Sequence, residues 1–163
     1  MKKSKKQNII IVTIAIIIIG AIAGYNYSVE QTKQKGLKFG NELQQIQEDV
    51  KQLQTEFNSK ITQWEEGDLS QQELSEYSKN HIEKLQNVIL KYDDLIPPKQ
   101  FASSVELFKL STQVQLDSDK EFIEWIKTSD DSHKIRSDSL LQESFEYEMM
   151  ALGEFNAAKL GLR

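Results

Sequence analysis

The stretch FASSVELFKLSTQVQLDSDKEFIEWIKT, residues 101–128, decides the fold of this chain because it carries two helical patterns at once. Drawn as a helix, it has one polar face, and the rest of its circumference is mostly apolar or small. That apolar arc is too wide for a single neighbouring helix. Serines recur at heptad spacing in its centre, at Ser104, Ser111 and Ser118. The stretch therefore predicts a helix buried by more than one neighbour.

The sequence after this stretch carries a matching row of small residues, Ser137, Ser144, Ala151 and Ala158, again every seventh residue. Folding the two segments back on each other at Ser129 and Asp130 predicts a close-packed antiparallel hairpin. Large side chains would face small ones, which fills space at interior density. The expected pairs are Phe122 with Ser137, Ser118 with Leu141, Phe108 with Ala151, Ser104 with Phe155, and Phe101 with Ala158.

The middle of the predicted hairpin is polar, with Gln115 expected opposite Ser144 and Ser111 opposite Glu148. One interpretation is a hydrogen-bonded network that fixes the register. The other is a small polar pocket between helices, which is a common place for ligands of bundles. Asp119 lies at a core-type position and must pair or reach water. We expect it to pair with a lysine or Arg136, or to lie at a bundle edge, rather than to act in catalysis. The candidate polar seam comprises Ser111, Gln115, Asp119, Ser144 and Glu148.

Two further helices are predicted before residue 98. Gly67 should end the first, and Ser70 with Glu73 forms a capping box that should begin the second. Pro97 and Pro98 should stop the second, and Pro98 can begin the third. The sequence thus predicts an all-α, up-down-up-down antiparallel four-helix bundle over residues 39–163. The apolar stripes are Phe39, Leu43, Ile46, Val50, Leu53, Phe57, Ile61 and Trp64, then Leu74, Tyr77, His81, Leu85, Val88, Tyr92 and Leu95.

An uncharged run begins at Ile9 and ends at Ala23, after four lysines. We interpret residues 9–27 as a transmembrane helix anchored in the lipid bilayer, residues 1–8 as a cytoplasmic basic tail and residues 28–38 as a juxtamembrane stalk. The protein would then be a single-pass protein of the cell membrane with most of its chain extracytoplasmic. The alternative is a signal peptide cleaved between Ala23 and Gly24, which would make the protein secreted.

Composition argues against several classes of function. All 25 acidic residues follow the apolar run, together with 16 of the 20 basic residues, so the exported part carries a formal charge of −9. That balance disfavours nucleic acid as a partner. The chain has no cysteine and only two histidines, so it offers no disulfide, thiol chemistry or conventional zinc site. Asp117 and Asp119 point apart on a helix and cannot share an ion. We expect no cofactor, no metal and no enzymatic activity.

The remaining function is binding. Our first hypothesis is a non-enzymatic binding or scaffold module for a protein partner or for a second copy of the chain. The contact would come from the first helix or from a partner face made of Leu107, Leu110, Val114 and Trp125. The second hypothesis is a small-ligand sensor or carrier that uses the polar seam.

Two segments carry a resemblance, FIEWI at residues 122–126 and SFEYEM at residues 144–149, together with the Pro-Pro entry into the third helix. Over residues 95–155 the chain resembles uncharacterised single-span helical proteins of archaea, and that resemblance implies no activity. More loosely, an N-terminal anchor before an external four-helix bundle is similar to the sensor half of chemoreceptors. This sequence departs from that family because it shows neither a second span nor a signalling domain.

Overall fold

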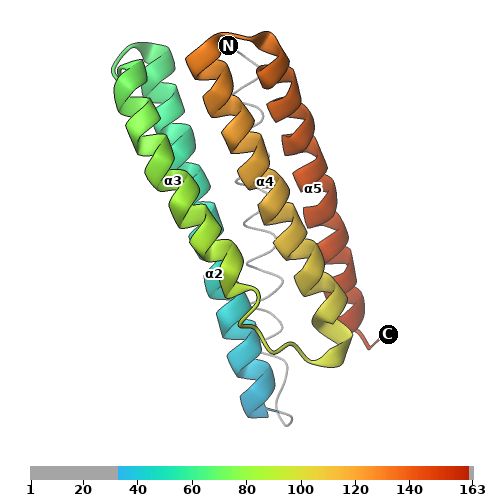
Figure 1. Ribbon diagram of the computed structural model, residues 1–163. Helices are drawn as coiled ribbons and strands as arrows, with labels where there is room; N and C mark the ends of the chain where they lie inside the picture. The colour runs from blue at the N-terminus through green and yellow to red at the C-terminus, as the bar shows by residue number, and fades with distance from the viewer. Residues whose placement is uncertain (1–32, 162–163) are drawn as a thin grey trace.

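The computed structural model describes residues 33–161, with side chains from residue 38 onward. Four helices run side by side, and successive helices are antiparallel (Figure 1). No strand occurs within these residues, so the all-α prediction is confirmed for them. The helices are α2 (Lys33–Glu66), α3 (Gln71–Lys91), α4 (Ala102–Thr128) and α5 (Asp131–Lys159), with one 3₁₀ turn, η1 (Lys99–Phe101), before α4.

The two ends of the bundle differ in what they contain. The start of α2, the connection from α3 to α4 and the end of α5 gather at one end, which we call the proximal end (Figure 1). The short turns at residues 67–70 and 129–130 lie at the other, distal end. Helix α2 begins at Lys33, so part of the predicted stalk is helical.

The predicted helix boundaries at the distal end are confirmed. Gly67 has a φ of +85°, a left-handed conformation that glycine adopts without steric cost, and it ends α2. The Ser70 hydroxyl accepts from the Glu73 amide at 3.3 Å, and the Glu73 carboxylate accepts from the Ser70 amide at 2.9 Å. This is the complete capping box. Asp130 caps α5 by accepting from the Ser132 amide at 2.9 Å.

The role predicted for Pro98 is wrong. Its backbone is extended, with φ −55° and ψ 146°, and its carbonyl accepts from the Phe101 amide at 2.8 Å. The chain therefore makes one 3₁₀ turn first, and α4 begins only at Ala102. The proline still serves its other predicted purpose, because α3 has ended before it.

The close α4–α5 hairpin exists, but its predicted register is wrong by one helical turn. Ser111 lies opposite Ser144: each hydroxyl donates to the other residue's backbone carbonyl, at 3.0 and 3.1 Å. Ser118 likewise donates to the Ser137 carbonyl at 2.8 Å. We call these contacts the serine seam. Small residues face small ones there, instead of the predicted pairs of Ser111 with Glu148 and Ser118 with Leu141.

A serine side chain is short, so these bonds require the two backbones to approach closely. The large side chains leave the seam and turn into the core. Phe155 shows this, because its ring lies 5.0 Å from the ring of Phe101, whereas the prediction had placed it against Ser104. The prediction paired large side chains with small ones and took no account of the backbone carbonyl as an acceptor. A hydroxyl can reach the opposite carbonyl only where both helices carry small residues.

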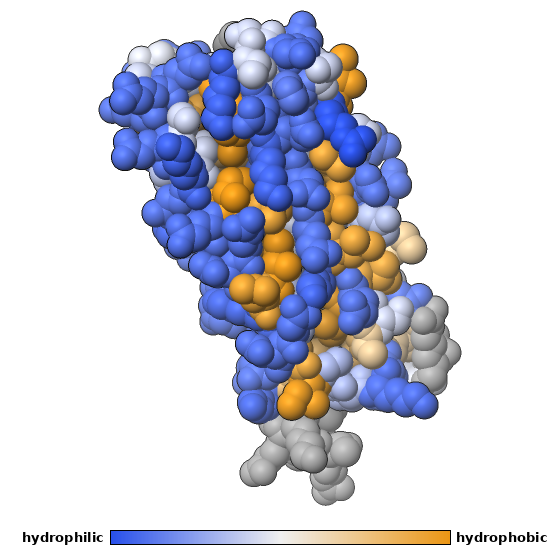
Figure 2. All heavy atoms as spheres, in the orientation of Figure 1, coloured by the Kyte–Doolittle hydropathy of each residue, from blue (hydrophilic) through white to orange (hydrophobic). Residues whose placement is uncertain are grey.

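The hydrophobic core is densest towards the proximal half. Hydrophobic atoms otherwise reach the surface as narrow strips between hydrophilic side chains on the face shown in Figure 2. Most residues of both predicted stripes are buried, and the others, Val50, Leu53, Ile61, Trp64 and Tyr77, are half-buried. The main cluster comprises Phe39, Leu43, Ile46, Val88, Tyr92, Leu95, Phe101, Val105, Phe108, Ala151, Leu152, Phe155 and Ala158.

Among the helices that the structure describes, none is long and apolar enough to cross a membrane. The predicted span at residues 9–27, its basic tail and the cleavage alternative at Ala23 and Gly24 lie outside the described residues.

The register gives a direct test, because the chain has no cysteine of its own. We expect the double variant Ser111→Cys, Ser144→Cys to form an intramolecular disulfide on mild oxidation, since the two hydroxyl oxygens lie 3.3 Å apart. Free thiols counted by mass spectrometry after alkylation would measure it. The matched control is Ser111→Cys, Glu148→Cys, the pair adjacent in the rejected register. Faster oxidation of the control pair would contradict the structure.

Candidate functional site

A cluster of polar side chains lies inside the bundle, centred on Asp119. Asp119 is buried, with 5% of its surface exposed, and donors from three helices surround its carboxylate. Its Oδ2 accepts from Gln54 Nε2 of α2 at 2.8 Å and lies 2.8 Å from His81 Nε2 of α3. Its Oδ1 accepts from Gln115 Nε2, one turn earlier on α4, at 3.2 Å. Asp119 therefore joins three of the four helices.

The partner predicted for Asp119 is wrong. Among the described residues its ion-pair partner is His81, not a lysine or Arg136. A lysine would have to bring an ammonium into the interior, whereas an imidazole on the apolar stripe of α3 is already there. The sequence places His81 and Asp119 each on an inward face, but only the packing of α3 on α4 brings the two faces together.

The His81 ring is held in place by a stacking contact and by its contact with Asp119. Its ring stacks on Phe57 of α2, with the ring centroids 4.2 Å apart and the planes 10° from parallel. Since Nε2 lies at hydrogen-bond distance from a carboxylate, that nitrogen carries the proton. The other ring nitrogen, Nδ1, is buried and has no hydrogen-bond partner.

A second polar group lies closer to the proximal end and was not predicted. The Tyr92 hydroxyl accepts from Gln47 Nε2 at 2.8 Å and lies 3.1 Å from Thr112 Oγ1. Thr112 gives its own proton to the Phe108 carbonyl, so Tyr92 donates to Thr112. Burial raises the pKa of Tyr92 strongly, so it remains a phenol and a donor. The signal that could have revealed this layer is the heptad spacing of Gln47 and Gln54 beside the apolar stripe of α2.

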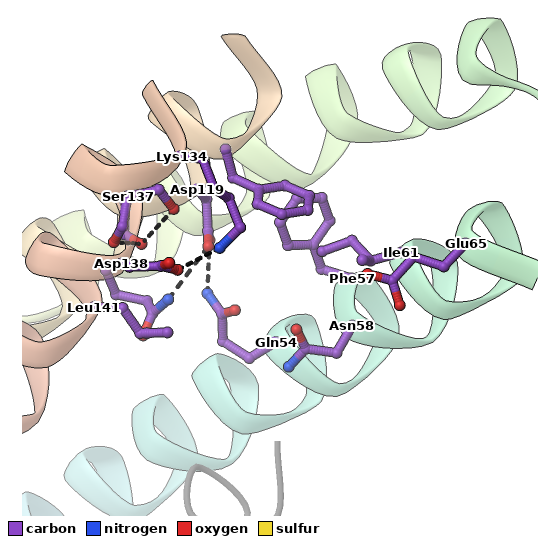
Figure 3. Close-up of a pocket in the computed structure, with 13 residues that line it drawn as sticks. Gln54, Phe57, Asn58, Ile61, Glu65, Asp119, Lys134, Ser137, Asp138 and Leu141 are labelled. Atoms are coloured by element: carbon purple, nitrogen blue, oxygen red, sulfur yellow. Dashed lines mark hydrogen bonds and ion pairs between the residues drawn. The ribbon is translucent and has the colours of Figure 1, made fainter. Parts of the chain in front are cut away.

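The five predicted seam residues line two adjoining hollows between α2 and α5, with α4 as their floor. The larger has a volume of about 100 Å³ and includes Gln115 and Asp119 (Figure 3). The smaller has about 40 Å³ and includes Ser111, Gln115, Ser144 and Glu148. Gln54 and Gln115 line both. The structure places the five residues in these two adjoining hollows, where Ser111 and Ser144 bond to each other and Gln115 bonds to Asp119.

The four residues of the predicted partner face lie in two separate places. Leu107 and Leu110 share a shallow surface hollow with Met150 of α5, whose side chain is 55% exposed. Val114 is half-buried. Trp125 lies elsewhere, with its ring centroid 6.0 Å from that of Trp64 of α2. The predicted face is therefore only partly a continuous surface.

The chemistry available at these places is limited. No group of three or more metal-ligating side chains occurs within the residues that the structure describes. The hydroxyls of Ser111, Ser118 and Ser144 each donate to a backbone carbonyl, and among the residues that the structure describes none of the three bonds to a base that would activate it. What the hollows offer is a preformed set of hydrogen-bond donors, acceptors and charges, which suits binding.

Comparison with protein-family models, curated proteins and solved structures finds no match to this chain.

Glu148 lines the smaller hollow, where burial disfavours the charged form of its carboxyl group. The carboxylate is half-buried, and burial raises its pKa from an ordinary 4.5 to about 7. The folded protein keeps the proton up to about pH 7, whereas the unfolded chain releases it near pH 4.5. The contribution of Glu148 to stability is therefore lost as the pH rises through that window.

We expect Glu148→Gln to be more stable than the wild type at pH 8, by about 1–3 kcal/mol, because it removes the buried charge. The two proteins should converge below about pH 4.5, where Glu148 is protonated in both states. Urea unfolding at several pH values measures the difference. Glu146→Gln, on the exposed face of the same helix, is the control and should show no such trend. A constant gap at all pH values would contradict the argument.

Proposed function

We propose that this protein is a membrane-tethered, non-enzymatic binding or scaffold module, with its four-helix bundle on the extracytoplasmic side. The apolar run at residues 9–23 after four lysines supports the tether and its orientation. The bundle would then be confined near the membrane, where a high effective concentration favours weak partners.

The observation that carries the proposed interaction is a shallow hollow on the outer side of α4 and α5, in which three apolar side chains lie among five polar ones. Leu107, Leu110 and Met150 line it, between hydrophilic neighbours such as Glu106 and Lys109. An apolar centre with a polar rim is the usual composition of a protein interface. We propose a protein partner or a second copy of the chain as its occupant.

The interface can be tested by cross-linking the full chain in its native membrane. We expect a specific adduct, either a homodimer or one heterologous complex. The double variant Leu110→Glu, Met150→Glu should reduce it about tenfold or more, because charges would enter the centre of the contact. The control is Ile135→Glu, which replaces an aliphatic side chain that is 70% exposed outside the hollow. An adduct that survives the double variant, or no adduct at all, would refute this interface.

The tether has its own test. We expect the mature protein to retain residues 1–23. It should also resist alkaline extraction from membranes, as an integral membrane protein does. N-terminal sequencing of the purified protein measures this. A mature protein that begins at Gly24 would replace the anchor with a cleaved signal peptide.

A second candidate function is a small-ligand sensor or carrier, and one observation favours it. The two polar hollows are prepared by side chains that are already hydrogen-bonded in place, including a buried carboxylate. Preorganised polar groups within an otherwise apolar lining are typical of ligand sites. The small volumes limit such a ligand to a few non-hydrogen atoms.

A further inference from the structure

We propose that the outer side of α5, with the adjoining part of α4, binds a basic amphipathic helix of a different protein. We call this surface the acidic face. The choice of partner rests on the binding function proposed above and decides between its two possible occupants, another protein and a second copy of the chain. It follows from the charge of the face, from the apolar side chains at its centre, and from a glycine that the bundle itself does not require.

The acidic face consists of two adjoining surface hollows, and Met150 lines both of them. One hollow lies along α5, and the other lies between α5 and α4. Their volumes are about 540 and 500 Å³, against about 100 and 40 Å³ for the two polar hollows beside Asp119 and Glu148. Of these four, only the outer pair has room for several side chains of another protein.

The length of the acidic face suits a helix. Its lining residues on α5 run from Ser139 to Glu154. At 1.5 Å per residue, this stretch is about 22 Å long, which equals the length of a helix of about 15 residues. A helix of four turns can therefore lie along the whole face.

The centre of the acidic face is apolar. Met150 is 55% exposed, and Leu107, Leu110 and Tyr147 are half-buried around it. Methionine is unbranched and adapts to the surface that it contacts, so it is frequent where a protein receives the apolar side of a helix. These side chains can bury an apolar stripe of the partner.

The rim of the face is acidic. Its four carboxylates belong to Glu106 of α4 and to Glu143, Glu146 and Glu154 of α5. The one lysine in the lining, Lys109, already pairs with Asp93 at 2.5 Å. Residues 137–158 of α5 include five acidic residues and no basic one. Because interfaces place opposite charges against each other, this rim favours lysines and arginines on the partner.

The same charge disfavours a second copy of the chain. In a two-fold dimer the acidic face would meet itself, so carboxylates would approach carboxylates across the contact. The four lysines before the apolar run could not supply the positive charge, since they would lie on the cytoplasmic side in the proposed arrangement. A different, basic protein therefore fits the face better than a copy of this chain.

Gly153 is an independent sign of an approaching chain. It lies three residues after Met150, and it is exposed within α5, where glycine is less favourable than alanine. Its φ is not positive, and a Cβ atom there would meet no other part of the bundle within 4 Å. Neither the backbone nor the packing of α5 requires a glycine, whereas bare backbone lets another chain come close.

The test measures binding of a synthetic helix to the full chain in phosphatidylcholine nanodiscs, by fluorescence anisotropy. The probe is a labelled peptide of about 15 residues, made of leucine and lysine with the leucines on one helical face. The control peptide has glutamate in place of every lysine, and empty nanodiscs give the binding to lipid. We expect the basic peptide to bind at least about tenfold more tightly than the acidic one, and less tightly at high salt.

Two triple variants locate the binding. They remove the same amount of charge from exposed positions, the first within the acidic face and the second on α2 and α3. The first is Glu106→Gln, Glu143→Gln, Glu146→Gln, and it should weaken binding of the basic peptide about tenfold. The second is Glu66→Gln, Glu76→Gln, Glu83→Gln, and it should leave the binding unchanged.

Gly153→Gln separates lost binding from lost folding. Glutamine is a better helix former than glycine, so the Tm should rise. Binding of the basic peptide should nevertheless weaken, about threefold or more, because the new side chain keeps the peptide away from the backbone of α5. A variant that is more stable and binds as well as the wild type would contradict the role given to Gly153.

The outcomes distinguish this inference from the function on which it rests. Equal binding of both peptides, no binding of either, or equal losses in the two triple variants would overturn the basic helix as partner. A cross-linked homodimer that is lost in Leu110→Glu, Met150→Glu would also overturn it, but would leave the proposed binding function intact. The absence of both peptide binding and a cross-linked adduct would overturn both.

Discussion

The close approach of α4 and α5 along the serine seam is the constraint on which the rest of the structure depends. Each seam hydroxyl spans the gap to the opposite backbone, so neither helix can carry a larger side chain there without separating the pair. The row repeats every seven residues, so its neighbours Ser104 and Ala151 fall into the same register, and both are fully buried. Large buried side chains of the two helices, such as Phe108 and Phe155, therefore lie in the core beside the seam rather than within it.

This arrangement makes α4 the central helix. It bonds to α5 through the seam, and Asp119 joins it to α2 through Gln54 and to α3 through His81. A sliding motion of any of these helices would leave a buried carboxylate without donors, which costs far more than the bonds contribute when intact. The Asp119 cluster is therefore a device that fixes the alignment of three helices, whether or not it also binds a ligand.

The interior divides along its length. Buried aromatic and aliphatic side chains are densest in the proximal half, whereas Gln54, His81 and Asp119 lie among the apolar side chains of the distal half. The apolar half supplies most of the driving force for folding, since burial of apolar area dominates it. The buried polar side chains around Asp119 contribute less to stability than apolar ones would, but their hydrogen bonds hold them in fixed positions. In the proposed arrangement the chain enters α2 from the membrane at the proximal end, so the hollow over Asp119 lies away from the lipid.

The sequence by itself determined the helices, because heptad stripes, Gly67, the Ser70 capping box and the proline stop act within one or two turns of chain. It also determined that Ser111, Gln115, Asp119, Ser144 and Glu148 share one polar region, since all face inward on two adjacent helices. Only the tertiary structure decided the register of the serine seam and the partner of Asp119. Both depend on a backbone carbonyl or a side chain of another helix, and a residue's own helical face says which way it points but not how far along the neighbouring helix its partner lies.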